Sequence, residues 1–330
     1  MKFTKEYIGQ QEFCRMSENV CNAVAEERNI PLPCLGFVGY AGLGKTNAAE
    51  MLAKWLKQAS EGQANALGER DEFNYVEINA ATTLPNLINM LVEIEHKRVL
   101  IFVDEAHALS KKVLNFLKPI LELGNAMTKE IRHGDFRFTV DRKRHLWIFA
   151  SNENLLDSAI FGSTGRATSI QFVPYSRKEV IDLIKFKASF WAKEFKITPE
   201  AIEYLADRVL PNGRAVDHLV KDECMYSGPT ITVEKAKEMC KTYKRFPGGL
   251  CVNDIKTLRF LGIDANGKQV NEISSHCGGE PSKETSYRLQ WLAGLGYVDT
   301  KAGKKRLTPP GAKYLADLEA KQKAKKAATR

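Results

Sequence analysis

The sequence predicts an α/β fold: a parallel sheet, followed by a small helical domain and a C-terminal domain of three helices and a β-hairpin. Two observations support this. Between residues 34 and 175, short and wholly apolar runs alternate with longer segments of helical periodicity. Strands that are apolar throughout are typical of a parallel sheet covered by helices on both faces. From residue 176 to about 244 only helical patterns occur, and Arg-Phe-Pro-Gly-Gly at 245–249 separates them from the last elements.

The predicted elements follow from these patterns. Apolar runs predict strands at residues 34–38, 75–78, 99–103, 146–150 and 170–173. Helical periodicity predicts helices over 46–56 and 111–123, and the polar, turn-rich residues 60–73 predict a surface loop. Thr198 followed by Pro199 marks the start of a helix. The expected division of the chain is 1–175 for the sheet domain, 176–245 for the helical domain, 246–320 for the C-terminal domain and 321–330 for a basic tail.

The positive charge of the chain is concentrated at one end. The 330 residues have a net charge of +9, and residues 301–330 alone hold ten Lys and Arg against two acidic residues. A basic excess confined to one end indicates an anionic partner there, nucleic acid before membrane. For residues 321–330 considered alone, a solubilising tail is the alternative interpretation.

Cysteine usage and hydropathy predict a cytoplasmic protein. The seven cysteines are scattered and form no Cys-x-x-Cys pair, which is typical of reduced thiols rather than disulfides or a zinc site. No apolar run approaches the ~18 residues that a membrane span needs. The first residues lack the apolar segment of a secretory signal, so no membrane association is expected.

A glycine-rich segment between the first predicted strand and the first predicted helix fits G-x-x-x-x-G-K-[ST] over residues 39–46. Small residues let successive backbone N–H groups wrap phosphates, the lysine reaches the β- and γ-phosphates, and the hydroxyl reaches Mg²⁺. The expected nucleotide contacts are Gly39, Gly42, Leu43, Gly44, Lys45 and Thr46. A dinucleotide fingerprint is disfavoured because it would need Gly or Ala at Asn47. A glycine-rich turn without a ligand is the remaining alternative.

Acidic and amide side chains follow two other predicted strands. Asp104 and Glu105 come directly after the run 99–103, and Asn152 follows the run 146–150. Ligands bind at the carboxyl ends of strands in open α/β sheets. We expect Asp104 to hold Mg²⁺ through water and Glu105 to orient or deprotonate the attacking water. Asn152 is expected to position that water or to sense the γ-phosphate. Taken alone, the acidic pair is also compatible with a helix cap and Asn152 with a turn.

The order of these motifs resembles that of AAA+ P-loop ATPases, and more narrowly that of the RuvB family of hexameric Holliday-junction branch-migration motors. Residues 7–10 (Tyr-Ile-Gly-Gln) resemble that family's adenine-side segment, and residues 42–46 match its phosphate loop. Two departures are visible: Tyr40-Ala41 replace the usual Pro-Pro, and Asn152 stands where RuvB more often has Thr. The resemblance implies ATP and Mg²⁺ as cofactors, a homo-oligomeric ring, a branched or duplex DNA substrate, and ATP contacts from Tyr7 and Ile8.

The resemblance also assigns two arginines. Gly165-Arg166, after the segment 156–160, resembles the stretch that carries the arginine finger, so Arg166 is expected to reach the γ-phosphate of a neighbouring subunit. RuvB itself carries arginine near the positions of Phe161 and Ser163. Residues 213–216 resemble the sensor 2 segment, which makes Arg214 the expected contact to the phosphates of the same subunit; a surface arginine at a helix start is the alternative.

Residues 131–138 alternate around Gly134-Asp135 and predict a β-hairpin inserted before the strand that ends at Asn152. The insertion resembles the pre-sensor-1 hairpin of the RuvB and MCM branch of AAA+ proteins. That hairpin docks the partner RuvA in one case and faces DNA in the other, so a RuvA-like partner is one expectation for it. A plain hairpin insertion is the alternative.

The last domain is similar to a winged helix. Residues 252–261, 270–277 and 282–295 predict three helices, and 297–300 and 305–308 predict the strands of a wing. Winged helices often touch the DNA backbone, although many bind protein instead. The basic residues expected to contact DNA are Lys283, Arg288, Lys304, Lys305 and Arg306.

Together these observations predict an AAA+ ATPase with a helical lid domain and a winged-helix domain, acting as an ATP-driven motor on duplex DNA or Holliday junctions. The alternative is a helicase loader or replication initiator that uses ATP as a clamp on DNA without translocating. A superfamily 2 helicase is disfavoured because the chain has one P-loop and no evident second motor domain.

Overall fold

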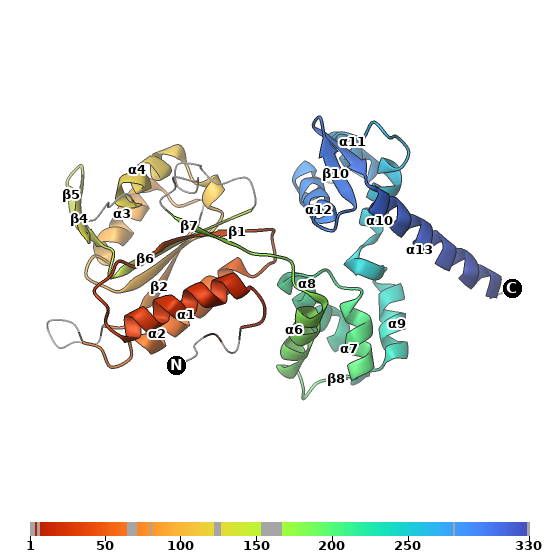
Figure 1. Ribbon diagram of the computed structural model, residues 1–330, viewed down its shortest axis with the longest axis horizontal. Coiled ribbons are helices and arrows are strands. Elements are labelled where there is room, and N and C mark those ends of the chain that lie inside the picture. The colour runs from red at the N-terminus through yellow and green to blue at the C-terminus, as the bar shows by residue number, and fades with distance from the viewer. Residues whose placement is uncertain are drawn as a thin grey trace. The chain divides into compact units, whose positions relative to one another are not determined.

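The computed structural model describes residues 4, 7–64, 71–79, 81–121, 127–152, 167–279 and 281–328. The chain forms two compact units, residues 1–176 and 177–330, which are described separately (Figure 1). The first unit ends one residue beyond the predicted boundary at 175. The second contains both the expected helical domain and the expected C-terminal domain.

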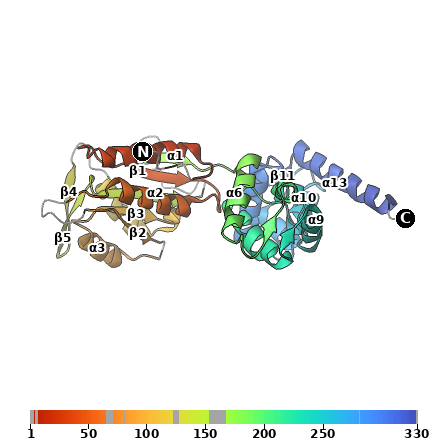
Figure 2. The same ribbon diagram turned by 90° about the horizontal axis from the view of Figure 1, so that it is seen from below.

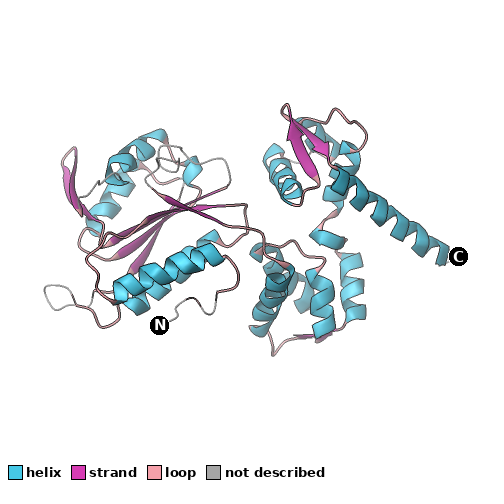
Figure 3. Ribbon diagram, viewed as in Figure 1, coloured by secondary structure: helices cyan, strands magenta, loops and turns pink. Residues whose placement is uncertain are grey.

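The first unit is built on a five-stranded parallel sheet with strand order β2-β3-β6-β1-β7. The strands are drawn in magenta in Figure 3. The strands are β1 (Cys34–Val38), β2 (Asn74–Ile78), β3 (Val99–Val103), β6 (His145–Ser151) and β7 (Thr168–Gln171). Ser151 pairs with Val38 and Phe149 with Val103, so the carboxyl ends of the three central strands reach the same edge of the sheet. This edge is where the predicted site residues emerge.

The predicted strands are confirmed, with one shift. The last strand lies two residues earlier than the apolar run 170–173 predicts. The backbone of Val173 is instead held by the Gln10 side chain, which accepts from its amide at 3.1 Å and donates to its carbonyl at 2.9 Å. Because these bonds replace strand pairing, Val173 leaves the sheet and is half exposed.

Helices cover both faces of the sheet (Figure 1). The helices of the first unit are α1 (Gln11–Ala25), α2 (Lys45–Ala59), α3 (Leu84–Glu93), the short η1 (Ala106–Ala108) and α4 (Lys111–Leu121). On one face, buried aromatic rings from α1, α2, β1 and the end of β7 pack together; they are Phe13, Trp55, Phe37 and Phe172. On the other face, apolar side chains of β3 and β6 pack against α3 and α4. Alternate strand residues therefore serve opposite cores.

The predicted β-hairpin is confirmed. Strands β4 (Thr128–His133) and β5 (Phe136–Asp141) pair antiparallel around Gly134-Asp135. Phe138 is buried in the core shared with α3 and α4, whereas Phe136 near the turn is 44% exposed. The hairpin is thus anchored at its base and exposed near its tip.

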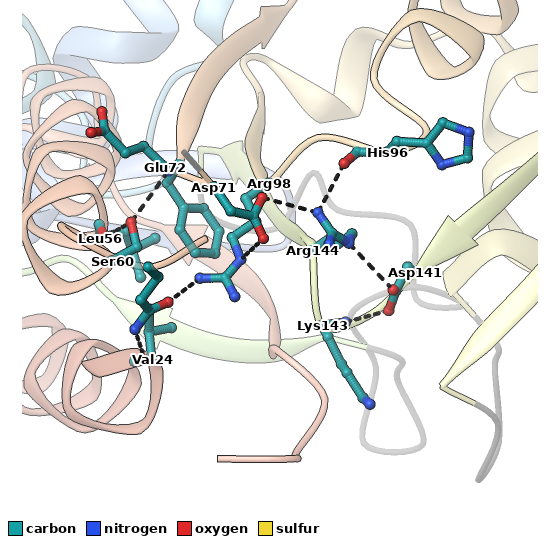
Figure 4. A network of polar contacts seen from close by, with 12 residues as sticks. Val24, Leu56, Ser60, Asp71, Glu72, His96, Arg98, Asp141, Lys143 and Arg144 are labelled. Carbon is teal, nitrogen blue, oxygen red and sulfur yellow. Dashed lines mark hydrogen bonds and ion pairs between the residues drawn. The ribbon is translucent and has the colours of Figure 1, made fainter. Parts of the chain in front are cut away.

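A polar network fixes the opposite edge of the sheet (Figure 4). The buried Asp71 carboxylate lies between two guanidiniums, with Arg98 Nε at 3.0 Å and Arg144 Nη1 at 3.0 Å. Arg144 also donates to the carbonyl of His96 at 2.8 Å. These bonds hold the starts of β3 and β6 to the segment before β2.

The second unit begins with a helical part. Its elements are α6 (Arg177–Ser189), β8 (Lys196–Ile197), α7 (Pro199–Ala206), α8 (Gly213–His218), the π-helix η2 (Leu219–Cys224), η3 (Met225–Ser227), β9 (Thr230–Ile231), α9 (Val233–Thr242) and η4 (Pro247–Gly249). The hydroxyl of Thr198 caps α7 by accepting from the amide of Ala201 at 3.3 Å, as its sequence position predicts. At the end of this part, the buried Glu223 pairs with Arg245.

Three helices and a hairpin follow in the predicted order. They are α10 (Val252–Leu261), α11 (Val270–His276), α12 (Ser282–Gly294), β10 (Val298–Lys301) and β11 (Lys304–Leu307). Buried apolar side chains from all three helices and β10 form one core, including Leu258, Ile273 and Leu292. The hairpin turns at Ala302 and Gly303, both with positive φ, as two-residue turns require.

A helix crosses the expected boundary between the C-terminal domain and the basic tail. Helix α13, which was not predicted, runs from Pro309 to Ala328 and so continues past residue 320. The segment is rich in Ala and Lys, which favour helix, but it lacks the apolar periodicity by which helices were predicted.

All seven cysteines are free thiols. Within the described ranges, no helix has the length and apolar character to cross a membrane.

Candidate nucleotide-binding site

The structure brings the predicted segments together at the carboxyl edge of the sheet. The glycine-rich loop follows β1, Asp104 follows β3, and Asn152 follows β6, which lies between the other two strands. The amide of Gly39 donates to the carbonyl of Ser151 at 3.3 Å, and the amide of Asp104 to the carbonyl of Ile78 at 2.9 Å. Backbone bonds to neighbouring strands therefore set where each segment leaves the sheet.

Close packing explains why glycine begins the loop. A Cβ on Gly39 would lie 2.5 Å from the carbonyl oxygen of Phe172, a distance that no side chain tolerates. At the other end of the loop, Gly44 is the N-cap of α2 with φ 90°, a left-handed conformation that favours glycine. The loop is therefore held against the sheet at its start and turns sharply into the helix at its end.

The start of α2 is suited to bind phosphate. Gly44 has no side chain to cap the helix, and the first-turn amides have no acceptor within an α-helix. These amides and the helix dipole favour an anion at this point. Lys45 adds a positive charge, with its ammonium bonded to the carbonyls of Gly39 at 2.6 Å and Tyr40 at 3.0 Å.

Two tyrosines hold the loop. The hydroxyl of Tyr7 donates to the carbonyl of Gly44 at 3.4 Å, and that of Tyr175 donates to the carbonyl of Leu43 at 3.2 Å. Burial, with a contribution from Tyr175, raises the pKa of Tyr7 well above its usual value, so its phenol stays a donor. Tyr7 thus contacts the loop from the predicted N-terminal segment, whereas its contact with adenine and that of Ile8 stay predictions. Tyr175 was not predicted, because it is distant in sequence and belongs to no local motif.

Glu105 adopts an unusual backbone conformation. It has φ 46° and ψ 44°, which costs a non-glycine residue about 1–2 kcal/mol. Its amide donates to Asp104 Oδ1 at 2.9 Å, while its own exposed side chain makes no capping hydrogen bond. The structure therefore disfavours a capping role for the Glu105 carboxylate. Strain of this kind is typical of residues at functional sites.

A short hydrogen-bonded chain links η1 to the end of β6. His107 Nδ1 lies 2.9 Å from Ser151 Oγ, and that hydroxyl lies 3.2 Å from the carbonyl of Asn152. Asn152 itself is buried. His107 is not among the predicted site residues, and in the structure it connects the acidic segment to the end of β6 and Asn152.

The donor set of the site fits Mg²⁺. Thr46 supplies a hydroxyl on the first turn of α2 and Asp104 a carboxylate after β3, and hard oxygen donors of this kind are what Mg²⁺ takes together with phosphate oxygens and water. Among the described residues there is no group of three or more His, Cys, Asp or Glu that could hold a metal without such additional ligands. A magnesium ion here would thus depend on bound phosphate and water.

Comparison with known proteins agrees with this geometry. Residues 35–175 match the profile described as the ATPase family associated with various cellular activities (AAA). These residues are an AAA ATPase domain. The domain spans all five strands of the sheet and every described element of the site except Tyr7 and Ile8. Nucleotide binding and ATP hydrolysis are the properties of this family.

Two curated relatives are similar over longer stretches. The Holliday junction branch migration complex subunit RuvB of Pseudothermotoga lettingae is 26% identical over 66% of this chain, and the alignment spans 58% of that protein. RuvB 1 of Synechococcus sp. is 25% identical over 94% of this chain and 79% of its own length.

A solved structure shares the fold across both units. The RuvB Holliday junction branch migration motor of Thermotoga maritima gives a TM-score of 0.71 at 19% identity, covering 96% of this chain and 97% of that one. Variants of the same protein give 0.73. At this identity the likeness concerns the fold alone.

Of the two predicted arginines, the structure describes one. Arg166 lies outside the described residues, together with the segment 156–160. Arg214 is exposed in the first turn of α8, behind an N-cap in which Asn212 accepts from the amide of Ala215 at 2.7 Å. In the described part of the chain it has no ion-pair partner. A cation at a helix N-terminus is unfavourable without an anion nearby, so this placement suits an anionic ligand.

The basic residues predicted to contact DNA fall into three groups. Lys304, Lys305 and Arg306 are part of β11 and are half-buried, with Lys305 Nζ 2.8 Å from the hydroxyl of Thr300. Lys283 is in the first turn of α12, but its side chain lies outside the described part of the structure.

Arg288 requires a correction. Its Nε lies 3.1 Å from Asp254 Oδ1, and its side chain is only 13% exposed. The guanidinium is therefore used inside the domain, where it joins α12 to α10, and it does not present a free charge to DNA.

Proposed function

We propose that the chain is an ATP-driven DNA motor of the RuvB type, which moves duplex DNA or drives branch migration of Holliday junctions. The observation that carries the proposal is the strained Glu105, which follows β3 at the same edge of the sheet as the phosphate loop. Its exposed carboxylate would activate the attacking water. The 25–26% identity to RuvB proteins supports the choice of DNA as the substrate.

The chain's own residues would divide the work of hydrolysis. The first-turn amides of α2 and Lys45 hold the β- and γ-phosphates, and Glu105 accepts a proton from the attacking water while Asn152 orients it. Thr46 and Asp104 would hold Mg²⁺, which neutralises charge on the phosphate oxygens when bound.

Arginines would complete the site. We assign Arg214 to the phosphates of its own subunit, because it is an exposed cation with no partner among the described residues. Arg166 would reach the nucleotide of a neighbouring subunit, which requires a ring of several copies, in our proposal a hexamer. The proposed place of action is the cytoplasm, where the chain meets both ATP and DNA.

The remaining parts would contact DNA and a partner. The C-terminal helices and the β10–β11 hairpin would act as a winged helix, with Lys304, Lys305 and Arg306 facing DNA phosphates. The β4–β5 hairpin, exposed at Phe136, would dock a RuvA-like protein.

A branch-migration assay on a synthetic four-way junction tests the proposal. With ATP, wild-type protein should convert the junction into two duplex products, with or without a RuvA-like partner. Glu105→Gln is the matched control, because it retains the shape of the site and should bind ATP without turning it over. ATP hydrolysis without junction movement, together with recruitment of a separate helicase, would favour the alternative of a loader.

A further inference from the structure

Helix α13 consists of two halves with different surroundings. The first half packs on the domain: Leu318 is buried, the Tyr314 hydroxyl donates to the carbonyl of Pro247 at 2.8 Å, and Glu319 lies 3.6 Å from Arg259. Towards its C-terminus the helix extends away from the other elements of the unit, as both views show (Figures 1 and 2). Of the side chains described there, Lys321 and Lys323 are exposed and form no hydrogen bond or ion pair.

The charge changes at the same point. The docked half carries Lys313, Asp317 and Glu319, so it is slightly acidic. The projecting half, residues 321–328, carries four lysines and no acidic residue. Within α13, the positive charge is therefore concentrated on residues 321–328.

The composition of the projecting half indicates what kind of partner it can bind. Residues 321–328 (Lys-Gln-Lys-Ala-Lys-Lys-Ala-Ala) contain no apolar side chain larger than that of Ala. A protein groove takes a helix through large apolar anchors, and a membrane surface takes one through an apolar face. Neither is present here. What remains is a high density of positive charge, which is complementary to the phosphate backbone of nucleic acid.

The energetics of the helix agree with such a partner. A helix of a few turns without packing is marginal in water, and four lysines within eight residues, with no acidic residue among them, disfavour a helix further. Continuation from the docked half and the favourable dipole at a helix C-terminus keep the segment helical. A polyanion would relieve the repulsion between the lysines.

We propose that residues 321–328 form a helical arm that binds the phosphate backbone of duplex DNA independently of base sequence, as a contact separate from the β10–β11 hairpin. The inference rests on the proposed function in that DNA is the substrate. It adds a DNA contact at the end of α13 to the contacts proposed for Lys304, Lys305 and Arg306 in the hairpin.

Duplex binding measured over a range of salt concentrations tests the arm. The test variant replaces all four lysines by Gln, which keeps helix propensity and removes the charge; they are Lys321, Lys323, Lys325 and Lys326. Each phosphate contact contributes about 0.9 to the slope of log Kobs against log salt, so the slope should fall by about 2–4. The matched control replaces the same lysines by Arg and should retain the wild-type slope. ATP hydrolysis without DNA should be unchanged in both variants.

A second measurement locates the contact. Lysine acetylation followed by mass spectrometry should show protection of Lys321 and Lys323 by a duplex, with Lys313 on the docked half as the internal reference. If wild-type protein binds duplex and the Gln variant binds it with the same slope and affinity, the arm is only a solubilising segment and this inference is overturned, while the proposed function stands. If wild-type protein binds no duplex at any salt concentration, the proposed function fails with it.

Discussion

Replacing Tyr175 with Phe tests how the phosphate loop is held. The substitution keeps the ring and removes the hydroxyl that donates to the carbonyl of Leu43 at 3.2 Å. Leu43 is fully buried, so its carbonyl would lose a partner that water cannot easily replace. The lost neutral bond and the unsatisfied carbonyl together cost about 1–2 kcal/mol. For a domain of this size that corresponds to a fall in Tm of about 2–6 °C.

The same substitution should weaken nucleotide binding. The C=O and N–H groups of a trans peptide point in opposite directions, so a bond that fixes the Leu43 carbonyl also fixes the Gly44 amide. If about 1 kcal/mol of loop ordering must then be supplied by the ligand, the Kd for ATP rises about fivefold. Thermal unfolding and a fluorescent-nucleotide titration measure the two effects. Tyr75→Phe is the matched control, because it removes a hydroxyl whose hydrogen bond is to the exposed Glu77 side chain. This variant should leave the Kd for ATP unchanged.

A double-mutant cycle with Tyr7→Phe sharpens the test. A Cβ at Gly44 would lie 3.1 Å from the Tyr175 hydroxyl and 3.4 Å from that of Tyr7, so both hydroxyls surround the same backbone. Contacting residues of this kind usually couple by 0.5 kcal/mol or more. If Tyr175→Phe lowers Tm but leaves the ATP Kd within twofold of wild type, Tyr175 only stabilises the fold and does not order the loop for nucleotide.

Four further outcomes are expected. Glu105→Gln should retain ATP binding and lose turnover by at least about 10²-fold, so unchanged hydrolysis in a steady-state assay would remove Glu105 from its role. Arg214→Ala should lower the hydrolysis rate by about 10²–10³-fold with the fold intact by circular dichroism; a normal rate would make it a surface residue. Glu223→Gln leaves a buried guanidinium without its carboxylate and should cost about 3 kcal/mol in denaturant unfolding, whereas Glu238→Gln, in an exposed pair, should cost less than about 1 kcal/mol. Burial lowers the pKa of His145 below its usual 6.5, so on acidification the unfolded chain binds the proton before the folded chain does. The free energy of unfolding should therefore fall as the pH drops below 6.5. A Tm of wild type that rises relative to that of His145→Gln as the pH drops below 6.5 would contradict this prediction.

Local patterns predicted most of the sheet domain. The run 99–103 is buried at every residue, and such a run has one interpretation once helical segments flank it. The phosphate loop was predicted from the pattern G-x-x-x-x-G-K-[ST]. The residues after β3 and β6 were predicted because ligands bind at the carboxyl ends of parallel strands.

Contacts between distant residues could not be predicted. Tyr175 reaches a loop more than 130 residues earlier in the chain, and Asp254 removes Arg288 from the surface through an ion pair across 34 residues. The left-handed Glu105 has no sequence signal, because the conformation comes from the surrounding backbone. Helix α13 was missed because its lysines and alanines favour helix by propensity without forming an apolar stripe.

In the proposed function, ATP hydrolysis at this site drives movement of DNA. We would measure the steady-state ATPase rate without DNA, and then with single strand, linear duplex and a synthetic four-way junction. Each rate is measured at low and at physiological salt. We expect duplex or junction to raise the rate several-fold, and Glu105→Gln to abolish it under every condition. An ATPase rate that no DNA changes at either salt concentration would contradict a role of this site in moving DNA.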